Sequence, residues 1–168
     1  MADVEAQVAL RDLRPGDRAG IARVLGACGD AFRPEEVALG LELVDESLDP
    51  GPTTDYAWAL AERGDGRLVG FACFGPVPLA EGTFDLYWIA VEPDARRSGA
   101  ASRLDGAVTA AVRGRGARWL LAETSSTPPY APAHAFYARQ GYRLLERIAD
   151  FYRPGDDRLT FGKRLDQG

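Results

Sequence analysis

The sequence predicts a mixed α/β fold, built as a single domain over residues 1–168. The length is that of one ordinary domain. Hydrophobic residues make up 46% and charged residues 27%, the balance of a globular protein with a real core. Segments with helical and strand periodicity follow one another with short turns. In the second half they alternate, which favours a mixed sheet with helices on both faces.

The first half predicts strand, helix, helix and hairpin. Residues 8–13 alternate like a strand. A helix follows, whose apolar positions recur at i, i+3, i+4 and i+7: Ile21, Val24, Leu25 and Cys28. Pro34 opens a second helix, because proline fits the first helical turn. Two apolar runs, residues 56–62 and 68–75, surround a Gly-Asp-Gly turn and predict a β-hairpin.

The second half predicts alternating strands and helices. Residues 83–91 are rich in aromatic and β-branched side chains, as is typical of a strand. A helix begins at Gly99, and a buried strand covers residues 118–124. A helix from Pro132 to Gln140 ends at Gly141, which supplies a left-handed turn. The last two strands are expected over residues 142–152 and 158–165, joined by residues 153–157.

Composition and charge exclude several classes of function. A net charge of −5 without a Lys/Arg block argues against nucleic-acid binding. The apolar runs are too short to span a bilayer, and residues 1–14 lack the apolar run of a signal peptide, so a cytoplasmic protein is expected. Cys28 and Cys73 are expected as buried free thiols rather than a disulfide. With one histidine and no metal-loop spacing, no metal site is expected.

The most informative stretch is "IAVEPDARRSGAAS", residues 89–102, in which a strand enters a loop and the loop enters a helix at Gly99. Amides at a helix start are unpaired and carry the positive end of the dipole. Small residues at positions 99–101 let a ligand approach the backbone, and Arg96 and Arg97 add charge. This predicts a pyrophosphate site. The alternative is an ordinary helix start with surface arginines.

Two motifs together resemble those of the GNAT superfamily of N-acetyltransferases. The first, Arg-x-x-Gly-x-Ala, consists of Arg96, Gly99 and Ala101. The second, about 40 residues later, consists of Phe136, Tyr137, Gly141 and Tyr142. The resemblance covers nearly the whole chain, because the order of elements also fits. It implies a mostly antiparallel sheet of about seven strands, with the fourth and fifth strands splayed apart.

The resemblance implies acetyl-CoA as the acyl donor. Its pyrophosphate would lie on the amides of residues 97–102, and its pantetheine arm would pair with the strand that ends at Val91. The implied cofactor-binding residues are Ile89, Ala90, Val91, Arg96, Arg97, Ser98, Gly99, Ala100, Ala101, Ser102, Tyr130 and Tyr137. The sequence departs from the family pattern at three positions: Ser98 replaces a loop glycine, Ala101 a second glycine, and Tyr130 a cofactor-binding asparagine.

Acetyl transfer to an amine needs a base and an acid. Asp85, at the start of the strand that leads to the phosphate loop, matches the family's base position. Glu123, late in the neighbouring strand, is the alternative, and either carboxylate could instead have a structural role. Tyr137 matches the general acid that protonates the departing thiolate, with Phe136 packed in the core. A purely structural Tyr137 is the competing interpretation.

Other residues carry weaker expectations. His134, on the same helix face as Tyr137, is either a proton relay or structural. The tryptophans are expected in the core: Trp58, Trp88 and Trp119. Tyr87 either lines the acceptor pocket or packs. The acidic helix that begins at Pro34 is either a solvated face or a wall that favours a cationic amine.

The sequence therefore predicts an N-acetyltransferase that acts on a primary amine of a small molecule, an amino acid or a protein N-terminus. A non-catalytic acyl-CoA-binding domain is the alternative from another class, and transfer of a longer acyl group is a third hypothesis. The expected partners are acetyl-CoA and the amine, without nucleic acid, membrane or metal, in a monomer or a homodimer.

Overall fold

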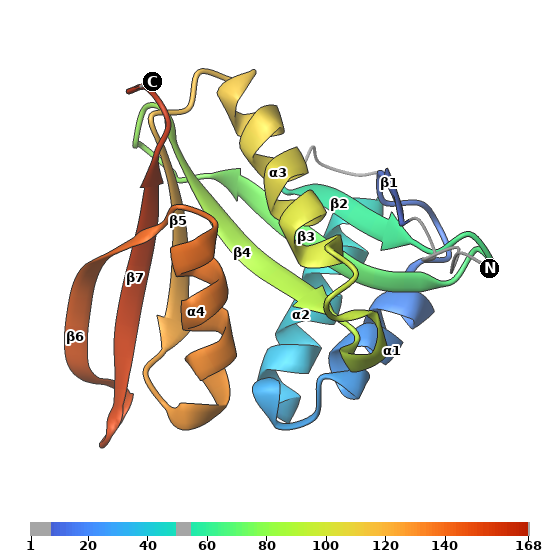
Figure 1. Ribbon diagram of the computed structural model, residues 1–168, viewed down its shortest axis with the longest axis horizontal. Coiled ribbons are helices and arrows are strands. Elements are labelled where there is room, and N and C mark those ends of the chain that lie inside the picture. Colours follow the sequence, from blue (N-terminus) through green and yellow to red (C-terminus); the bar gives the residue numbers. More distant parts are fainter. Residues whose placement is uncertain (1–7, 50–54, 168) are drawn as a thin grey trace. The chain divides into compact units, whose positions relative to one another are not determined.

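A computed structural model describes residues 8–49 and 55–167. Seven strands form one sheet in the order β1-β2-β3-β4-β5-β7-β6 (Figure 1). The strands are β1 Ala9–Arg11, β2 Ala57–Glu62, β3 Leu68–Pro76, β4 Thr83–Val91, β5 Trp119–Ser125, β6 Arg143–Arg153 and β7 Asp156–Arg164. The pair β4 and β5 is parallel, and β1/β2, β2/β3, β5/β7 and β6/β7 are antiparallel. The predicted mixed, mostly antiparallel sheet is confirmed.

The four predicted helices are also present. They are α1 Arg18–Ala27, α2 Pro34–Leu48, α3 Ala100–Arg113 and α4 Ala131–Arg139. Short 3-10 helices cover Gly29–Ala31, Pro93–Ala95 and Pro128–Tyr130. The last hairpin differs from the prediction, because its strands extend to Arg153 and from Asp156 and leave a tighter turn. Gly155 makes that turn with a φ of 80°, in the left-handed region that glycine adopts without penalty.

The described residues fall into two compact units. The first unit comprises residues 8–49, 55–74 and 88–108, and the second comprises residues 75–87 and 109–167. The predicted single domain stays a prediction.

In the first unit, α1 and α2 pack on one face of the hairpin formed by β2 and β3. The buried cluster contains Ile21, Val24, Leu25, Val44, Trp58, Leu60, Leu68, Phe71, Cys73 and Ala90. Trp88 is half-buried against this cluster. A bulge in β3 brings Leu68 onto this face, because Ala61 pairs with Gly70 while Glu62 pairs with Leu68.

Helix α3 begins on the opposite face of β3. Gly70 and Phe71 are successive residues of a strand, so their side-chain directions oppose each other. A Cβ at Gly70 would lie 3.3 Å from Leu104 Cδ1 of α3, whereas Phe71 belongs to the cluster under α1 and α2. The first unit therefore carries helices on both faces of its strands, as predicted.

In the second unit, β7 lies between β5 and β6, and α4 covers one face. Phe161 of β7 marks that face, because its ring lies 5.5 Å from Tyr137 and 5.6 Å from His134, both on α4. Leu120 and Ala122 of β5 are buried, and Ala122 pairs with Phe161. Trp119 is only half-buried beneath Arg164, so the prediction of a core tryptophan there is wrong.

Both cysteines are free thiols. Cys73 is buried in β3, and Cys28 is half-buried after α1. Burial raises the pKa of both thiols, because the thiolate loses its hydration. None of the helices in the described part of the chain is long and apolar enough to cross a membrane.

The close approach of β4 to β3 predicts opposite effects for two glycine substitutions. A Cβ at Gly70 would lie 2.9 Å from Ala90 O and 2.9 Å from Val91 Cγ2. Gly70→Ala should therefore lower the free energy of unfolding by about 1–3 kcal/mol, the usual cost of overpacking. Gly106→Ala in α3 is the matched control: its Cβ meets nothing within 4 Å, so it should raise stability by about 0.5–1 kcal/mol. Urea denaturation measures both, and a Gly70→Ala variant as stable as the wild type would contradict this packing.

Candidate active site

The loop between β4 and α3 belongs to the first unit and is built from successive tight turns. Ala95 N donates to Glu92 O (3.0 Å), and Ser98 N donates to Ala95 O (3.4 Å). The Ser98 hydroxyl also donates to Ala95 O at 2.6 Å. Ser98, which replaces a glycine of the family pattern, thus closes the turn with its own side chain.

Two residues of this loop have left-handed backbone conformations. Gly99 has a φ of 78° and Arg97 a φ of 68°. Glycine adopts this region freely, but an L-residue such as arginine pays about 1–2 kcal/mol. Strain of this kind clusters at ligand-binding loops, where the surrounding structure enforces it. A Cβ at Gly99 would meet nothing within 4 Å, so the backbone conformation and not crowding requires glycine there.

The loop delivers the chain into α3 with its first amides outside the helical hydrogen-bond ladder. Arg103 N donates to Gly99 O at 2.9 Å. The amides of residues 99–102 come before that bond and have no carbonyl four residues earlier within α3. Residues 96–99 and Ser102 are exposed, while Ala100 is buried against the unit. Small residues at the start of α3 and arginines in the preceding loop are typical of an anion site, and anion binding here stays a prediction.

A depression beside the loop is lined by loop residues and by residues before β1, after β2 and in β3. Its volume is about 290 Å³, and its walls are Val8, Arg63, Val69 and residues 94–98. The predicted phosphate-binding residues Arg96, Arg97 and Ser98 therefore contribute to one concave surface. Ile89, Ala90 and Val91, the residues expected to pair with the pantetheine arm, form the end of β4 immediately before the loop.

A buried carboxylate anchors the start of this loop. Glu92 is 1% exposed, and its two oxygens pair with Arg23 of α1 and, at 2.9 Å, with Arg67. Glu92 N donates to Val69 O at 2.8 Å, at the β3 bulge. A buried carboxylate is costly unless it is paired, so Arg23 and Arg67 hold this point in place. Sequence reasoning missed Glu92, because nothing in the local pattern marks it as buried.

In the second unit, α4 ends in a Schellman motif that orients Tyr137. Tyr142 N donates to Tyr137 O (3.0 Å), and Gly141 N donates to Ala138 O (3.2 Å). Gly141 has a φ of 86°, and the rings of Tyr137 and Tyr142 lie 5.3 Å apart. This is the pattern of helix termination at glycine, including its apolar contact across the turn. The prediction that Gly141 ends the helix in a left-handed turn is confirmed.

The Tyr137 ring is 7% exposed and contacts aromatic rings on three sides. The expected division of roles in the Phe136-Tyr137 pair is only partly right, because Phe136 is half-buried while Tyr137 is the buried ring. Packing therefore fixes Tyr137 in one position, which suits a residue that must present its hydroxyl at a defined point. Its role as the general acid stays a prediction.

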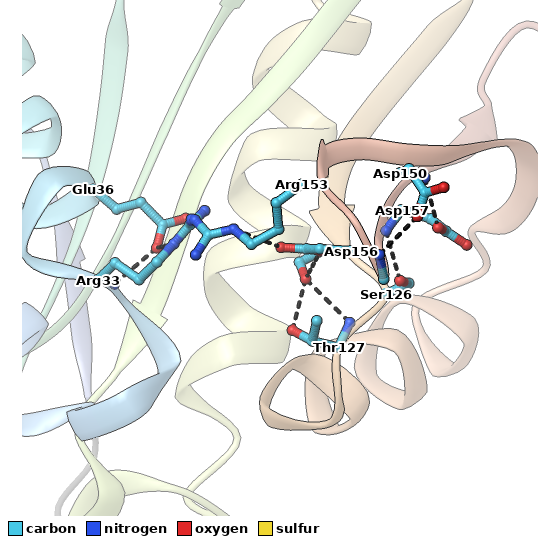
Figure 2. A network of polar contacts seen from close by, with 10 residues as sticks. Arg33, Glu36, Ser126, Thr127, Asp150, Arg153, Asp156 and Asp157 are labelled. Atoms are coloured by element: carbon cyan, nitrogen blue, oxygen red, sulfur yellow. Dashed lines mark hydrogen bonds and ion pairs between the residues drawn. The ribbon is translucent and has the colours of Figure 1, made fainter.

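A polar network ties the end of β5 to the last hairpin and to α4. His134 Nε2 lies 2.8 Å from Ser125 O, and the Ser125 hydroxyl donates to Asp156 (2.5 Å). Figure 2 shows Asp157 beside Asp150 and Ser126, where Asp150 N donates to the Asp157 carboxylate at 2.9 Å. His134 also stacks on Phe161. These contacts favour the structural interpretation of His134.

The two candidate bases lie on one face of the second unit's sheet. Asp85 pairs with Leu121 in the parallel ladder of β4 and β5. Glu123 follows Leu121 by two residues, so Asp85 and Glu123 project to the same side as diagonal neighbours. Burial, and then the negative charge of Glu123, raise the pKa of Asp85. The folded state therefore opposes ionisation of Asp85. This cost is absent below the ordinary carboxyl pKa and is complete above the raised one.

Glu123 has partners that sequence reasoning did not find. The Tyr152 hydroxyl donates to Glu123 Oε1 at 2.8 Å, and Arg158 lies 3.8 Å from Glu123 Oε2. Tyr152 comes from β6 and Arg158 from β7. No sequence signal links these residues to Glu123, because the register of two antiparallel ladders brings them together.

Tyr137 lies on the face opposite to the two carboxylates. Glu123 pairs with Thr160 and the preceding Ala122 pairs with Phe161, and Phe161 packs under Tyr137. Since successive side chains of a strand alternate between faces, Asp85 and Glu123 point away from α4. The structure thus brings the two carboxylates together and keeps the phenol on the other side. Tyr130 lies in the 3-10 helix that precedes α4.

Comparisons with known proteins agree with this architecture. The model of the acetyltransferase (GNAT) family matches residues 29–142. A GNAT-family protein from Desulfovibrio desulfuricans is 41% identical, with a TM-score of 0.89 over 95% of this chain and 99% of that one. Nourseothricin acetyltransferase is 26% identical, with a TM-score of 0.71 over 94% and 98%. An aminoglycoside 6'-N-acetyltransferase complexed with coenzyme A shares the fold, with 15% identity and a TM-score of 0.73 over 95% and 98%. None of the curated proteins matches.

The fold and these matches define the protein as an acyltransferase. It belongs to the GNAT family of acetyltransferases.

The left-handed conformation of Arg97 predicts an unusual response to glycine. Arg97→Gly relieves backbone strain of about 1–2 kcal/mol, which more than offsets the entropy that glycine adds to the unfolded chain, about 0.4–1 kcal/mol. The variant should therefore be at least as stable as the wild type. Arg96→Gly is the matched control, because Arg96 has a φ of −66° and gains nothing from glycine. Urea denaturation should give Arg96→Gly a lower free energy of unfolding than the wild type. A clearly lower free energy of unfolding in Arg97→Gly would contradict the backbone strain.

Proposed function

We propose that the protein transfers an acetyl group from acetyl-CoA to a primary amine. The main support is the pair of features that β4 connects. This single strand starts beside the Asp85 carboxylate and ends at the loop whose small residues lead into α3. A base at one end of a strand and an anion site at the other suit a donor that is long and negatively charged, with its reactive group far from its phosphates.

The loop is suited to the pyrophosphate of acetyl-CoA. The start of α3 presents the positive end of the helix dipole, and the Ala100 amide already donates there to the Ser98 hydroxyl at 3.4 Å. Arg96 and Arg97 supply positive charge. The ion pairs of Glu92 hold the start of the loop in place at the end of β4. The edge formed by Ile89, Ala90 and Val91 would pair with the amides of the pantetheine arm. The solved aminoglycoside acetyltransferase with coenzyme A supports a ligand of this class.

Asp85 would act as the base. An alkyl ammonium has a pKa near 10.4, so only about one molecule in 10³ carries a free amine at pH 7. A carboxylate whose pKa is raised by burial and by Glu123 accepts a proton more readily than an ordinary aspartate. Asp85 takes the proton from the ammonium, and the amine nitrogen then attacks the thioester carbon directly.

Tyr137 would complete the reaction from the other face. As the tetrahedral intermediate collapses, the C–S bond breaks and sulfur leaves with the electron pair. The Tyr137 phenol donates a proton to that sulfur. The amide nitrogen loses its second proton through solvent to the Tyr137 phenolate, and Asp85 releases the first proton to solvent. The base acts at the attacking nitrogen and the acid acts at the departing sulfur, so the two groups must stand at separate positions around the thioester carbon. The opposite orientations of Asp85 and Tyr137 about the second unit's sheet support this arrangement.

The acceptor is a primary amine, and the carboxylates on the face of Asp85 favour a cationic one. The nourseothricin relative makes an amine-bearing small molecule the first acceptor to test. A panel of nourseothricin, an aminoglycoside, free amino acids and short peptides, read by thiol release from acetyl-CoA, tests the proposal. Thiol release with none of them, in a protein that still binds acetyl-CoA, would favour the non-catalytic acyl-CoA-binding alternative.

Binding of acetyl-CoA should stabilise the fold through the loop of residues 96–102. Ligand at 100 times its Kd adds about 2.7 kcal/mol to the free energy of unfolding, which a thermal melt detects. Gly99→Glu should abolish the stabilisation, because it places negative charge beside the pyrophosphate. Gly106→Ala, in the same helix but away from its start, should keep it. An unchanged melting temperature of the wild type at millimolar acetyl-CoA would refute the donor assignment.

Tyr137→Phe separates catalysis from packing, because it keeps the buried ring and removes only the hydroxyl. We expect kcat to fall by about 10²-fold, the scale for losing a general acid. The stabilisation by acetyl-CoA should remain. Tyr142→Phe, in the same aromatic cluster, is the matched control and should retain turnover. A Tyr137→Phe enzyme within a factor of two of the wild type would show that Tyr137 only packs.

A further inference from the structure

The residue that stands out beyond the predicted site is Tyr152, which β6 carries next to the last hairpin turn. Most of β6 is exposed, but Tyr152 is half-buried. Its hydroxyl donates to Glu123 Oε1 at 2.8 Å. The contact joins β6 to β5 across the whole width of β7, which lies between them. A tyrosine of an edge strand therefore reaches a carboxylate two strands away.

The contact immobilises a side chain that is otherwise in water. The Glu123 side chain is 51% exposed, and an exposed glutamate samples several rotamers unless it is held. Tyr152 holds one oxygen, and Arg158 lies 3.8 Å from the other. Arg158 is itself positioned over the Phe151 ring, 4.4 Å from its centroid. Two adjacent aromatic residues of β6 thus restrain Glu123, one directly and one through Arg158.

The restrained carboxylate is the charged group that acts on Asp85. Strand register and the printed contacts place the following charged and titratable groups of the described residues on this side: Asp85 and Tyr87 on β4, Glu123 on β5, Arg143, Glu146 and Tyr152 on β6, and Asp156, Arg158 and Arg164 on β7. Arg158 pairs with Glu146 at 3.0 Å, and Asp156 accepts from Ser125. Glu123 is the diagonal neighbour of Asp85, and its negative charge adds to burial in raising the pKa of Asp85.

We propose that Tyr152 is a positioning residue of the transfer reaction, which holds Glu123 beside Asp85 so that Asp85 serves as the base. The proposal rests on the proposed function, because it assigns a role within the same reaction. Glu123 then acts as the fixed negative neighbour that keeps Asp85 basic and attracts the acceptor ammonium, and not as the proton acceptor itself.

Removing the phenol has a defined consequence. Without Tyr152, Glu123 keeps only Arg158, and its side chain turns toward the guanidinium and into solvent. The negative charge near Asp85 is then neutralised and screened, so the pKa of Asp85 falls. Glu123→Gln lowers it further in the same direction, because that substitution removes the charge itself. If Tyr152 acts only through Glu123, Tyr152→Phe changes nothing in the Glu123→Gln protein.

The first test needs no acceptor. Carboxyl-carbon NMR of protein labelled at aspartate follows the titration of Asp85, assigned by its loss in Asp85→Asn. We expect Asp85 to titrate at lower pH in Tyr152→Phe, at still lower pH in Glu123→Gln, and at the same pH in the double variant as in Glu123→Gln. The control is Tyr56→Phe, which changes a tyrosine of the first unit. In this variant Asp85 should titrate at the same pH as in the wild type. An unchanged titration in Tyr152→Phe, or an equal shift in both backgrounds, would overturn the proposal.

The second test uses the acceptor found by thiol release. Tyr152→Phe should lower kcat/KM by about tenfold, the scale of one hydrogen bond to a charged group, and shift the acidic limb of its pH profile to lower pH. The stabilisation by acetyl-CoA should stay intact, which a general loss of folding would not allow. If Asp85→Asn keeps the acidic limb, Glu123 is the base and the proposal is wrong, while the transfer reaction itself still stands. If no acceptor is acetylated, the proposed function is wrong. The NMR titration still decides whether Tyr152 acts on Asp85 through Glu123.

Discussion

The first unit depends on the ion pairs of one buried carboxylate, Glu92, with Arg23 and Arg67. A carboxylate that is 1% exposed is tolerated only when cationic partners replace its water. Arg23 comes from α1 and Arg67 immediately precedes β3, so this one carboxylate joins a helix, a hairpin and the end of β4. The β3 bulge accepts the Glu92 amide at the same point. The loop toward α3 therefore starts from a point fixed by charge and by backbone hydrogen bonding together.

After Glu92, the backbone of the loop adopts a conformation that is unfavourable for one of its residues. Arg97 adopts a left-handed conformation that glycine would adopt at no cost. The rigid anchor at Glu92 on one side and the buried Ala100 on the other make this strain sustainable. The result is a start of α3 that follows an exposed loop with two arginines, Arg96 and Arg97. Strain held between two anchors is a common property of loops that bind ligands.

In the second unit, the alternation of side chains along a strand decides which polar residues share a face of the sheet. Ala122, on the α4 side, and Glu123, on the carboxylate side, are consecutive residues of β5. The same alternation in β7 separates Phe161 beneath Tyr137 from Thr160 beside Glu123. In acyl transfer, the base acts at the attacking nitrogen and the acid acts at the departing sulfur, which are different atoms of the tetrahedral intermediate. The alternation in β5 and β7 therefore places Tyr137 on one face of this sheet and the carboxylates Asp85 and Glu123 on the other.

The sequence by itself determined the order of the elements, the loop glycine and the helix stop. Gly99 and Gly141 could be read locally, because a left-handed residue at a helix boundary is a property of the backbone next to it. The family could also be read, since its two motifs are short and contiguous. Only the tertiary structure decided which polar residues are partners. Glu92 with Arg23, and Glu123 with Tyr152, are 69 and 29 residues apart. Such pairs arise from strand register and helix packing, in which a shift of one residue would turn each side chain to the opposite face.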